Sequence, residues 1–280
     1  MADEFLRKVL ESLRAKSKEI LNGFRLKRKE NGRPVRACDI VEATVLGIAA
    51  FPLSIGYFQT AIFRPLRITN NKRLIGPVFG LFSVAVSGSI ASLLFVLYVN
   101  FSKDISTRAF ETYKQKLDSL ISPLQYSYSH YDLLLYSLGS LMVFKAFGGR
   151  FRSVLPSSLV HPGAFARVSL PAPGQLYASD AIREKLTKLG RKYGCHTCGT
   201  KRSPLFIGDH IPPNKLVKPG QKQRFFPQCT NCSKDQGISL SVNSKKLPIK
   251  THGTTLRLYH LWLPLPAYLM WLRSDTDSQC

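Results

Sequence analysis

The chain has 280 residues, 44% of them hydrophobic, and a formal net charge of +23 at pH 7. This length allows one large domain or two ordinary ones, and so much positive charge favours a polyanionic neighbour, either nucleic acid or anionic lipid. Six cysteines, four of them in two C-x-x-C pairs, exclude a disulfide-rich secreted domain and are typical of a metal site in a reducing compartment.

Residues 1–38 are predicted to form a basic amphipathic N-terminal helix, because apolar residues recur at helical spacing between Lys and Arg. Such a helix either packs on its own protein or lies on an anionic membrane surface. No apolar signal core is visible in it, and Asp3 and Glu4 argue against a transit peptide.

Two long uncharged runs predict a helical membrane region over residues 39–150. The runs cover 43–63 and 74–101, and neither contains a charged residue. A helix of about 20 apolar residues crosses the hydrocarbon layer, and one Lys or Arg at its centre costs about 3 kcal/mol. We therefore expect two spans that form a helical hairpin.

Small residues recur along one face of the second run, at Gly76, Gly80 and Gly88. Small residues allow two helices to approach closely. The pattern predicts either close packing within the hairpin or a face through which two copies form a homo-oligomer.

Two weaker apolar runs follow. The run 133–149 has 12 uncharged residues between Asp132 and Lys145, so a third span there is left open. The stretch 151–180 is rich in Pro, Ser and Gly and is predicted as a linker. The C-terminal segment 251–280 contains Trp and Pro and is predicted to be interfacial.

Residues 181–250 carry fifteen Lys and Arg against three acids, together with both C-x-x-C pairs. Each pair points two thiolates at one centre, so two pairs complete a tetrahedral Zn(II) shell. The predicted ligands of this structural zinc are Cys195, Cys198, Cys229 and Cys232. Because zinc thiolates require reducing conditions, we expect this domain on the reducing side of an intracellular, multi-pass membrane protein.

The pieces CHTC (195–198), FIGDHIPP (206–213) and CTNC (229–232) together resemble the HNH (His-Me finger) nuclease family. The resemblance implies a treble-clef, ββα-type fold in which the cysteines hold zinc. It also implies that His210 is a general base and that Asp209 is a ligand of a catalytic divalent ion, Mg(II) or Mn(II).

The chain departs from the family pattern in two places. The family usually has an asparagine a few residues before the second cysteine pair and a histidine or asparagine directly after it. Here the first region reads QKQRFFPQC, and the second position is Ser233. The alternative is that Asp209 and His210 form a turn and that His210 packs against the zinc knuckle.

The expected fold class is mixed, with an α-helical membrane hairpin and a small α+β zinc-binding domain. The leading function is a membrane-anchored module that binds nucleic acid or another polyanion. The alternatives are a metal-dependent nuclease and a structural membrane protein whose zinc module contacts lipid headgroups or a protein. The predicted polyanion-binding residues are Lys215, Lys218, Lys222 and Arg224.

Overall fold

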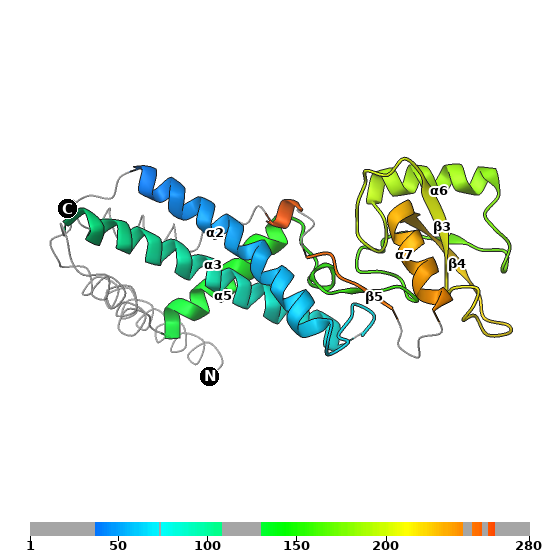
Figure 1. The fold of residues 1–280 in the computed structure, drawn as a ribbon, viewed down its shortest axis with the longest axis horizontal. Helices are drawn as coiled ribbons and strands as arrows, with labels where there is room; N and C mark the ends of the chain where they lie inside the picture. The colour runs from blue at the N-terminus through cyan, green and yellow to red at the C-terminus, as the bar shows by residue number, and fades with distance from the viewer. Residues whose placement is uncertain (1–36, 73, 108–129, 243–247, 254–256, 261–280) are drawn as a thin grey trace, which may run out of the picture.

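The structure is a computed structural model that describes residues 37–72, 74–107, 130–242, 248–253 and 257–260. Residues 1–36 of the predicted N-terminal helix (1–38) and most of the predicted interfacial segment (251–280) lie outside these residues. The molecule is elongated, with helices at one end and a mixed α and β part at the other (Figure 1). The mixed fold class is therefore confirmed.

The two predicted spans are long helices that pack against each other. α2 runs Ala37–Tyr57 and continues as a π-helix, η1, over Phe58–Phe63, and α3 runs Ile75–Thr107. Among the described helices, the segments Cys38–Phe63 and Ile75–Val99 are long and apolar enough to cross a membrane. Pro52 lies inside α2 without ending it.

Burial along these two helices is low for helices of such composition. Only 28% of the apolar window in the first helix and 44% of that in the second is buried. Large side chains such as Leu53 (71% exposed) and Val78 (65% exposed) face outward. A soluble core helix would bury most of these residues, so the exposure favours a lipid-facing position.

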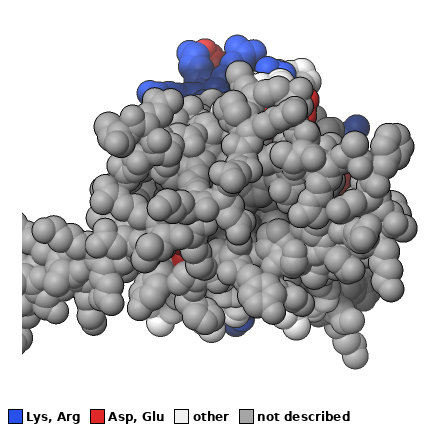
Figure 2. Space-filling model, turned by 90° about the vertical axis from the view of Figure 1, so that its left-hand side faces the viewer, with Lys and Arg blue, Asp and Glu red and all other residues white. Residues whose placement is uncertain are grey.

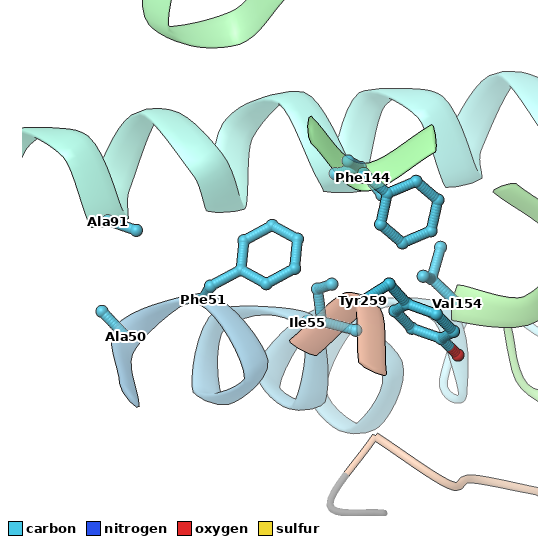
Figure 3. Close-up of a cluster of buried hydrophobic side chains, with 8 residues drawn as sticks. Ala50, Phe51, Ile55, Ala91, Phe144, Val154 and Tyr259 are labelled. Carbon is cyan, nitrogen blue, oxygen red and sulfur yellow. The ribbon is translucent and has the colours of Figure 1, made fainter. Parts of the chain in front are cut away.

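A third helix, α5 (His130–Ala146), packs against α3 and crosses it (Figure 1). Figure 3 shows the apolar cluster where the three helices meet the 3₁₀ helices η2 (Phe151–Val154) and η3 (Leu258–His260). Its buried members are Ala50, Phe51, Ile55, Val84, Ala91, Phe144, Val154 and Tyr259. Tyr259 follows the metal-binding region in sequence, so the chain returns to the helices after that region.

The predicted small-residue face is used within the chain. A Cβ at Gly80 would collide with the backbone of Phe151, and a Cβ at Gly88 would collide with Ser140. Close approach of α5 and η2 to α3 therefore requires glycine at both positions. The homo-oligomer stays a prediction.

The mixed part contains a three-stranded antiparallel sheet. Its strands, in sheet order, are β2 (Leu170–Pro171), β4 (Arg224–Cys229) and β3 (Phe206–Ile211). Two helices, α6 (Asp180–Tyr193) and α7 (Thr230–Ser241), contact β3 and β4. Residues of β3 and β4 that lie directly opposite each other share a face of the sheet.

The stretch 151–180 joins the two parts of the molecule and is largely built into them. Residues 153–160 are all buried. Within them, β1 (Ser157–Ser158) pairs antiparallel with β5 (Ile249–Lys250). Further along the same stretch, β2 is an edge strand of the three-stranded sheet and pairs with β4. The metal-binding part thus draws on residues before 181.

Candidate metal centre

The first C-x-x-C pair lies in a tight turn between α6 and β3. The N–H of Gly199 donates to the carbonyl of Cys195 at 2.7 Å, and the N–H of Cys195 donates to the carbonyl of Thr200 at 2.8 Å. Gly194 and Gly199 have positive φ values of 89° and 71°, a conformation that disfavours side chains. These bonds aim both thiols into the domain.

The second pair lies where β4 turns into α7. Cys229 ends the strand and is the N-cap residue of the helix, and Cys232 lies in the first helical turn. One helical turn spaces the two sulfurs so that both face the first pair. Phe206 of β3 is fully buried in the same cluster and covers it from the α6 side.

The four sulfur atoms lie close enough to share one ion. All four are within 4.8 Å of one another, and the sulfurs of Cys198 and Cys229 are 3.7 Å apart. Four sulfurs bound tetrahedrally at about 2.3 Å from one centre would be about 3.8 Å apart. The geometry therefore fits a four-coordinate metal site, and no disulfide joins the described cysteines.

The electrostatics of the cluster also suit a cation. Burial raises the pKa of Cys195, but hydrogen bonds from the thiols of Cys198, Cys229 and Cys232 outweigh it and lower this pKa. The pKa of Cys232 is raised by its three thiol neighbours. Four thiols this close together, three of them buried, cannot all ionise unless a positive ion is bound among them.

His196, between the two cysteines of the first pair, begins a buried polar network. The N–H of Gly163 donates to Nδ1 of His196 at 3.0 Å. The neutral ring therefore carries its proton on Nε2, which donates to Oδ2 of Asp209 at 3.0 Å. Gln236 of α7 donates to the same oxygen at 3.3 Å and to the carbonyl of Leu159 at 2.6 Å.

Asp209 is only 7% exposed, and burial raises its pKa even though His196 and Gln236 both favour the charged form. The described residues offer a cluster of three or more metal-ligating side chains only at the four cysteines, so Asp209 joins no second cation site there. Its contacts instead tie the first knuckle, β3 and α7 together.

His210 lies on the opposite face of β3 from Asp209, because adjacent strand residues alternate. Its partner across the ladder is Phe225, whose ring lies 4.6 Å away in a T-shaped contact. Nε2 of His210 donates to the carbonyl of Leu176 at 3.0 Å, which orients the ring. The predicted base and the predicted ligand therefore face opposite sides of β3 and contact different residues.

The four predicted polyanion-binding residues are all exposed, but two of them have local partners. Lys215 donates to the carbonyl of Leu240 at 3.3 Å, and Arg224 donates to Oγ of Ser169 at 2.6 Å. Within the described part of the chain, Lys218 and Lys222 form no ion pair through their side chains. Figure 1 places the β3–β4 loop that carries them at the end farthest from α2 and α3.

Arg257 and Phe165 support the first knuckle, and the sequence held no signal for either. Arg257 donates to the carbonyl of Gly199 at 2.7 Å and to that of Cys198. Its guanidinium lies 4.5 Å from the ring centroid of Phe165, whose side chain fills the space beside Gly199. His196 could have been found, since it is the histidine inside CHTC.

Comparisons of the chain with models of known protein families, with curated proteins and with solved structures found no match. The assignment of the site therefore rests on its own geometry.

Proposed function

We propose that the chain is a membrane-anchored protein in which a structural zinc ion orders a basic, treble-clef-like domain that binds a polyanion, with nucleic acid as the leading ligand class. The proposed ligands of the zinc are Cys195, Cys198, Cys229 and Cys232. The order of β3, β4 and α7, with one cysteine pair on each side of β3, supports the ββα comparison with HNH proteins.

One observation carries the choice of partner. The loop between β3 and β4 holds three lysines and no acid, and it lies at the end of the molecule away from the helices that fit a membrane (Figure 1). Headgroups of the same bilayer would contact residues near the helix ends. Because the lysines of the β3–β4 loop lie at the opposite end of the molecule, they favour a polyanion in solution over the headgroups of the same bilayer.

A second basic surface lies along α6, which presents its positive residues outward. Its buried side holds Leu186 and Gly190. Ion pairs join Arg183 to Asp180 and Lys188 to Glu184, whereas Lys185, Arg191 and Lys192 are exposed. In Figure 2, Lys and Arg gather at the top edge of the molecule, at the height of α6 in Figure 1.

The nuclease alternative draws less support from the geometry. A metal-dependent hydrolase needs a base and a bound cation at one reacting centre. Asp209 faces His196 and Gln236, whereas His210 faces Phe225 on the other side of the strand. The position of Asp209 suits a structural role, so binding without cleavage is the better proposal.

The test uses the full chain in nanodiscs of zwitterionic lipid. We expect about one zinc ion per chain by elemental analysis, and binding of a fluorescent single-stranded oligonucleotide that weakens steeply with salt. The double variant Lys218→Glu/Lys222→Glu should bind about tenfold or more weakly and show a shallower salt dependence.

The matched control Arg64→Glu/Lys72→Glu changes the same charge near the helix ends and should bind like the wild type. Equal loss in both variants, or no salt-dependent binding, would overturn the proposal. Cleavage of the oligonucleotide with Mg(II) or Mn(II) that is lost in His210→Ala would favour the nuclease instead. Binding that appears only with anionic nanodiscs would favour the lipid alternative.

A further inference from the structure

α5 crosses α3 within the segment of α3 that is long and apolar enough to span a membrane (Figure 1). Its contacts with α3 run in antiparallel order, because residue numbers rise along α5 while those of their partners fall. The residues that meet are Ser137 with Ser89 and Ser140 with Gly88. Tyr136 belongs to the apolar cluster that contains Ala43, Phe95 and Val99, and Phe144 belongs to the cluster around Phe51 and Val84.

α5 joins two apolar layers of the helical part. The layer around Ala43 and Phe95 lies nearer the start of α2, and the layer around Phe51 and Val84 lies nearer the α2–α3 loop, so α5 runs from the first layer to the second. The 17 residues of α5 are about 25 Å long at about 1.5 Å per residue, against a hydrocarbon layer of about 30 Å. The charged residues of α5 are at its ends, Asp132 in the first turn and Lys145 in the last. Nζ of Lys145 lies 5.5 Å from the ring centroid of Phe151, where it can extend toward the polar boundary.

The outer side of α5 is apolar and uncovered by the described chain. Leu134, Leu138 and Met142 lie one helical turn apart and are 55%, 49% and 69% exposed. Leu53 of α2 and Val78 of α3 are exposed in the same way. An apolar surface shared by three helices of this length fits lipid hydrocarbon rather than water.

The loop between α2 and α3 lies at the end of the helices that meets the metal-binding part. The N–H of Asn70 donates to the carbonyl of Pro156 at 3.1 Å, and Nδ2 of Asn70 donates to the carbonyl of Pro162 at 2.8 Å. The N–H of Ser158 donates back to Oδ1 of Asn70 at 3.2 Å. α2 begins at the opposite end of the helices (Figure 1).

We propose that α5 is a third membrane crossing, so that the metal-binding part lies on the opposite side of the bilayer from the start of α2. Two crossings followed by an external α5 would put both on one side and would separate Asn70 from Pro156 and Pro162. This arrangement rests on the membrane association proposed above, but not on polyanion binding. The thiol cluster and the α2–α3 loop then share the reducing side.

Labelling with a membrane-impermeant maleimide tests this arrangement on the full chain in sealed vesicles of known orientation. Cys38, exposed at the start of α2, reports one end in a Cys280→Ser background. Lys72→Cys and Lys218→Cys, each in a Cys38→Ser/Cys280→Ser background, report the α2–α3 loop and the distal loop. The background variant without a new cysteine measures labelling of the metal site, and its zinc content checks folding.

We expect Lys72→Cys and Lys218→Cys to be labelled from one side and Cys38 to be labelled from that side only after permeabilisation. Labelling of Cys38 and Lys218→Cys from the same side would overturn the third crossing. Labelling of all three positions in intact vesicles would overturn membrane crossing itself. Loss of oligonucleotide binding changes none of these patterns, so the two proposals fail separately.

Discussion

Asp209 shows how a single residue can suit two different chemistries until its neighbours are known. An acid beside a histidine at a strand end suggests a metal-dependent active site, and the same acid serves equally well as an internal hydrogen-bond acceptor. The neighbours that distinguish the two are His196 and Gln236, which are 13 and 27 residues away in sequence. No local pattern reports such a contact.

We expect Asp209→Ala to lower the free energy of unfolding by about 2–3 kcal/mol, because it leaves buried donors on His196 and Gln236 without an acceptor. Asp209→Asn keeps an acceptor oxygen and should cost less. Thermal unfolding of the full chain in detergent measures both. The control Asp235→Ala removes an ion pair with Lys250 that is about one third exposed, and it should cost about 1 kcal/mol or less.

A catalytic role for Asp209 would give the contrary result. Asp209→Ala would then unfold like the wild type while any metal-dependent cleavage disappeared.

At the scale of elements, the long helices and the cysteine pairs were predictable, whereas the short strands were not. The runs at 43–63 and 74–101 became the helical segments Cys38–Phe63 and Ile75–Val99, since uninterrupted apolar composition is a strong local signal. Strands of two residues, such as β1 and β5, have no periodicity to detect. Their pairing depends on contacts across about 90 residues of sequence.

The close contact of α5 with α3 predicts that adding a single methyl group there destabilises the helical part. Gly88→Ala places a methyl group against Ser140 and should lower the stability of the helical part by about 1–3 kcal/mol. Gly237→Ala, in α7, meets no atom within 4 Å and should be neutral or stabilising by up to about 1 kcal/mol. Melting temperatures in detergent compare the two. Equal effects would show that α5 does not pack here.

The buried ring of His252 predicts that acid weakens the contact between the segment that follows β5 and η1. Burial, with Arg257 and His260 adding positive charge, lowers the pKa of His252 from 6.5 to about 3. The N–H of His252 donates to Oε1 of Gln59 at 2.8 Å, so the residue sits against η1. The ring of His252 therefore stays neutral in the folded chain as the pH falls, whereas in the unfolded chain the same ring gains a proton.

The stabilisation is therefore complete above about pH 6.5 and is lost progressively as pH falls toward 3, with about 2 kcal/mol lost by pH 5. His252→Asn should remove this part of the pH dependence. Unfolding of both proteins at pH 7.5 and pH 5 tests the expectation, and identical pH profiles would contradict it.

At the scale of the whole molecule, the metal-binding part is predicted to need its metal in order to stay folded, whereas the helices are predicted to stay folded through apolar packing. Among the described residues, the metal-binding part has two small apolar clusters, one with Phe206 at the thiols and one around Leu186 and Phe225, whereas the helices share the larger cluster around Phe51 and Phe144. A strong chelator, or Cys232→Ala, should open the metal-binding part and leave the helices folded. Hydrogen exchange should rise in β3, β4 and α7 and stay low in α3.

Cys38→Ala is the matched control and should leave exchange unchanged, since Cys38 lies outside the cluster. Simultaneous loss of protection in α3 would show that the two parts unfold as one unit. Protection that survives chelation in β3 and β4 would show that the metal does not hold the domain.

Because β1 pairs with β5, two segments of the chain instead of one connect the metal-binding part to the helices. If the helices lie in a bilayer as proposed, a single flexible connection would let the lysines of the β3–β4 loop move through a wide volume beside it. The two connecting segments pair with each other, and Gly253 lies against Gly56 of the first helix. These contacts restrict that motion. The β3–β4 loop is thereby held at a fixed distance and orientation relative to the helices. A long, charged ligand bound there would lie at a constant distance from the proposed bilayer.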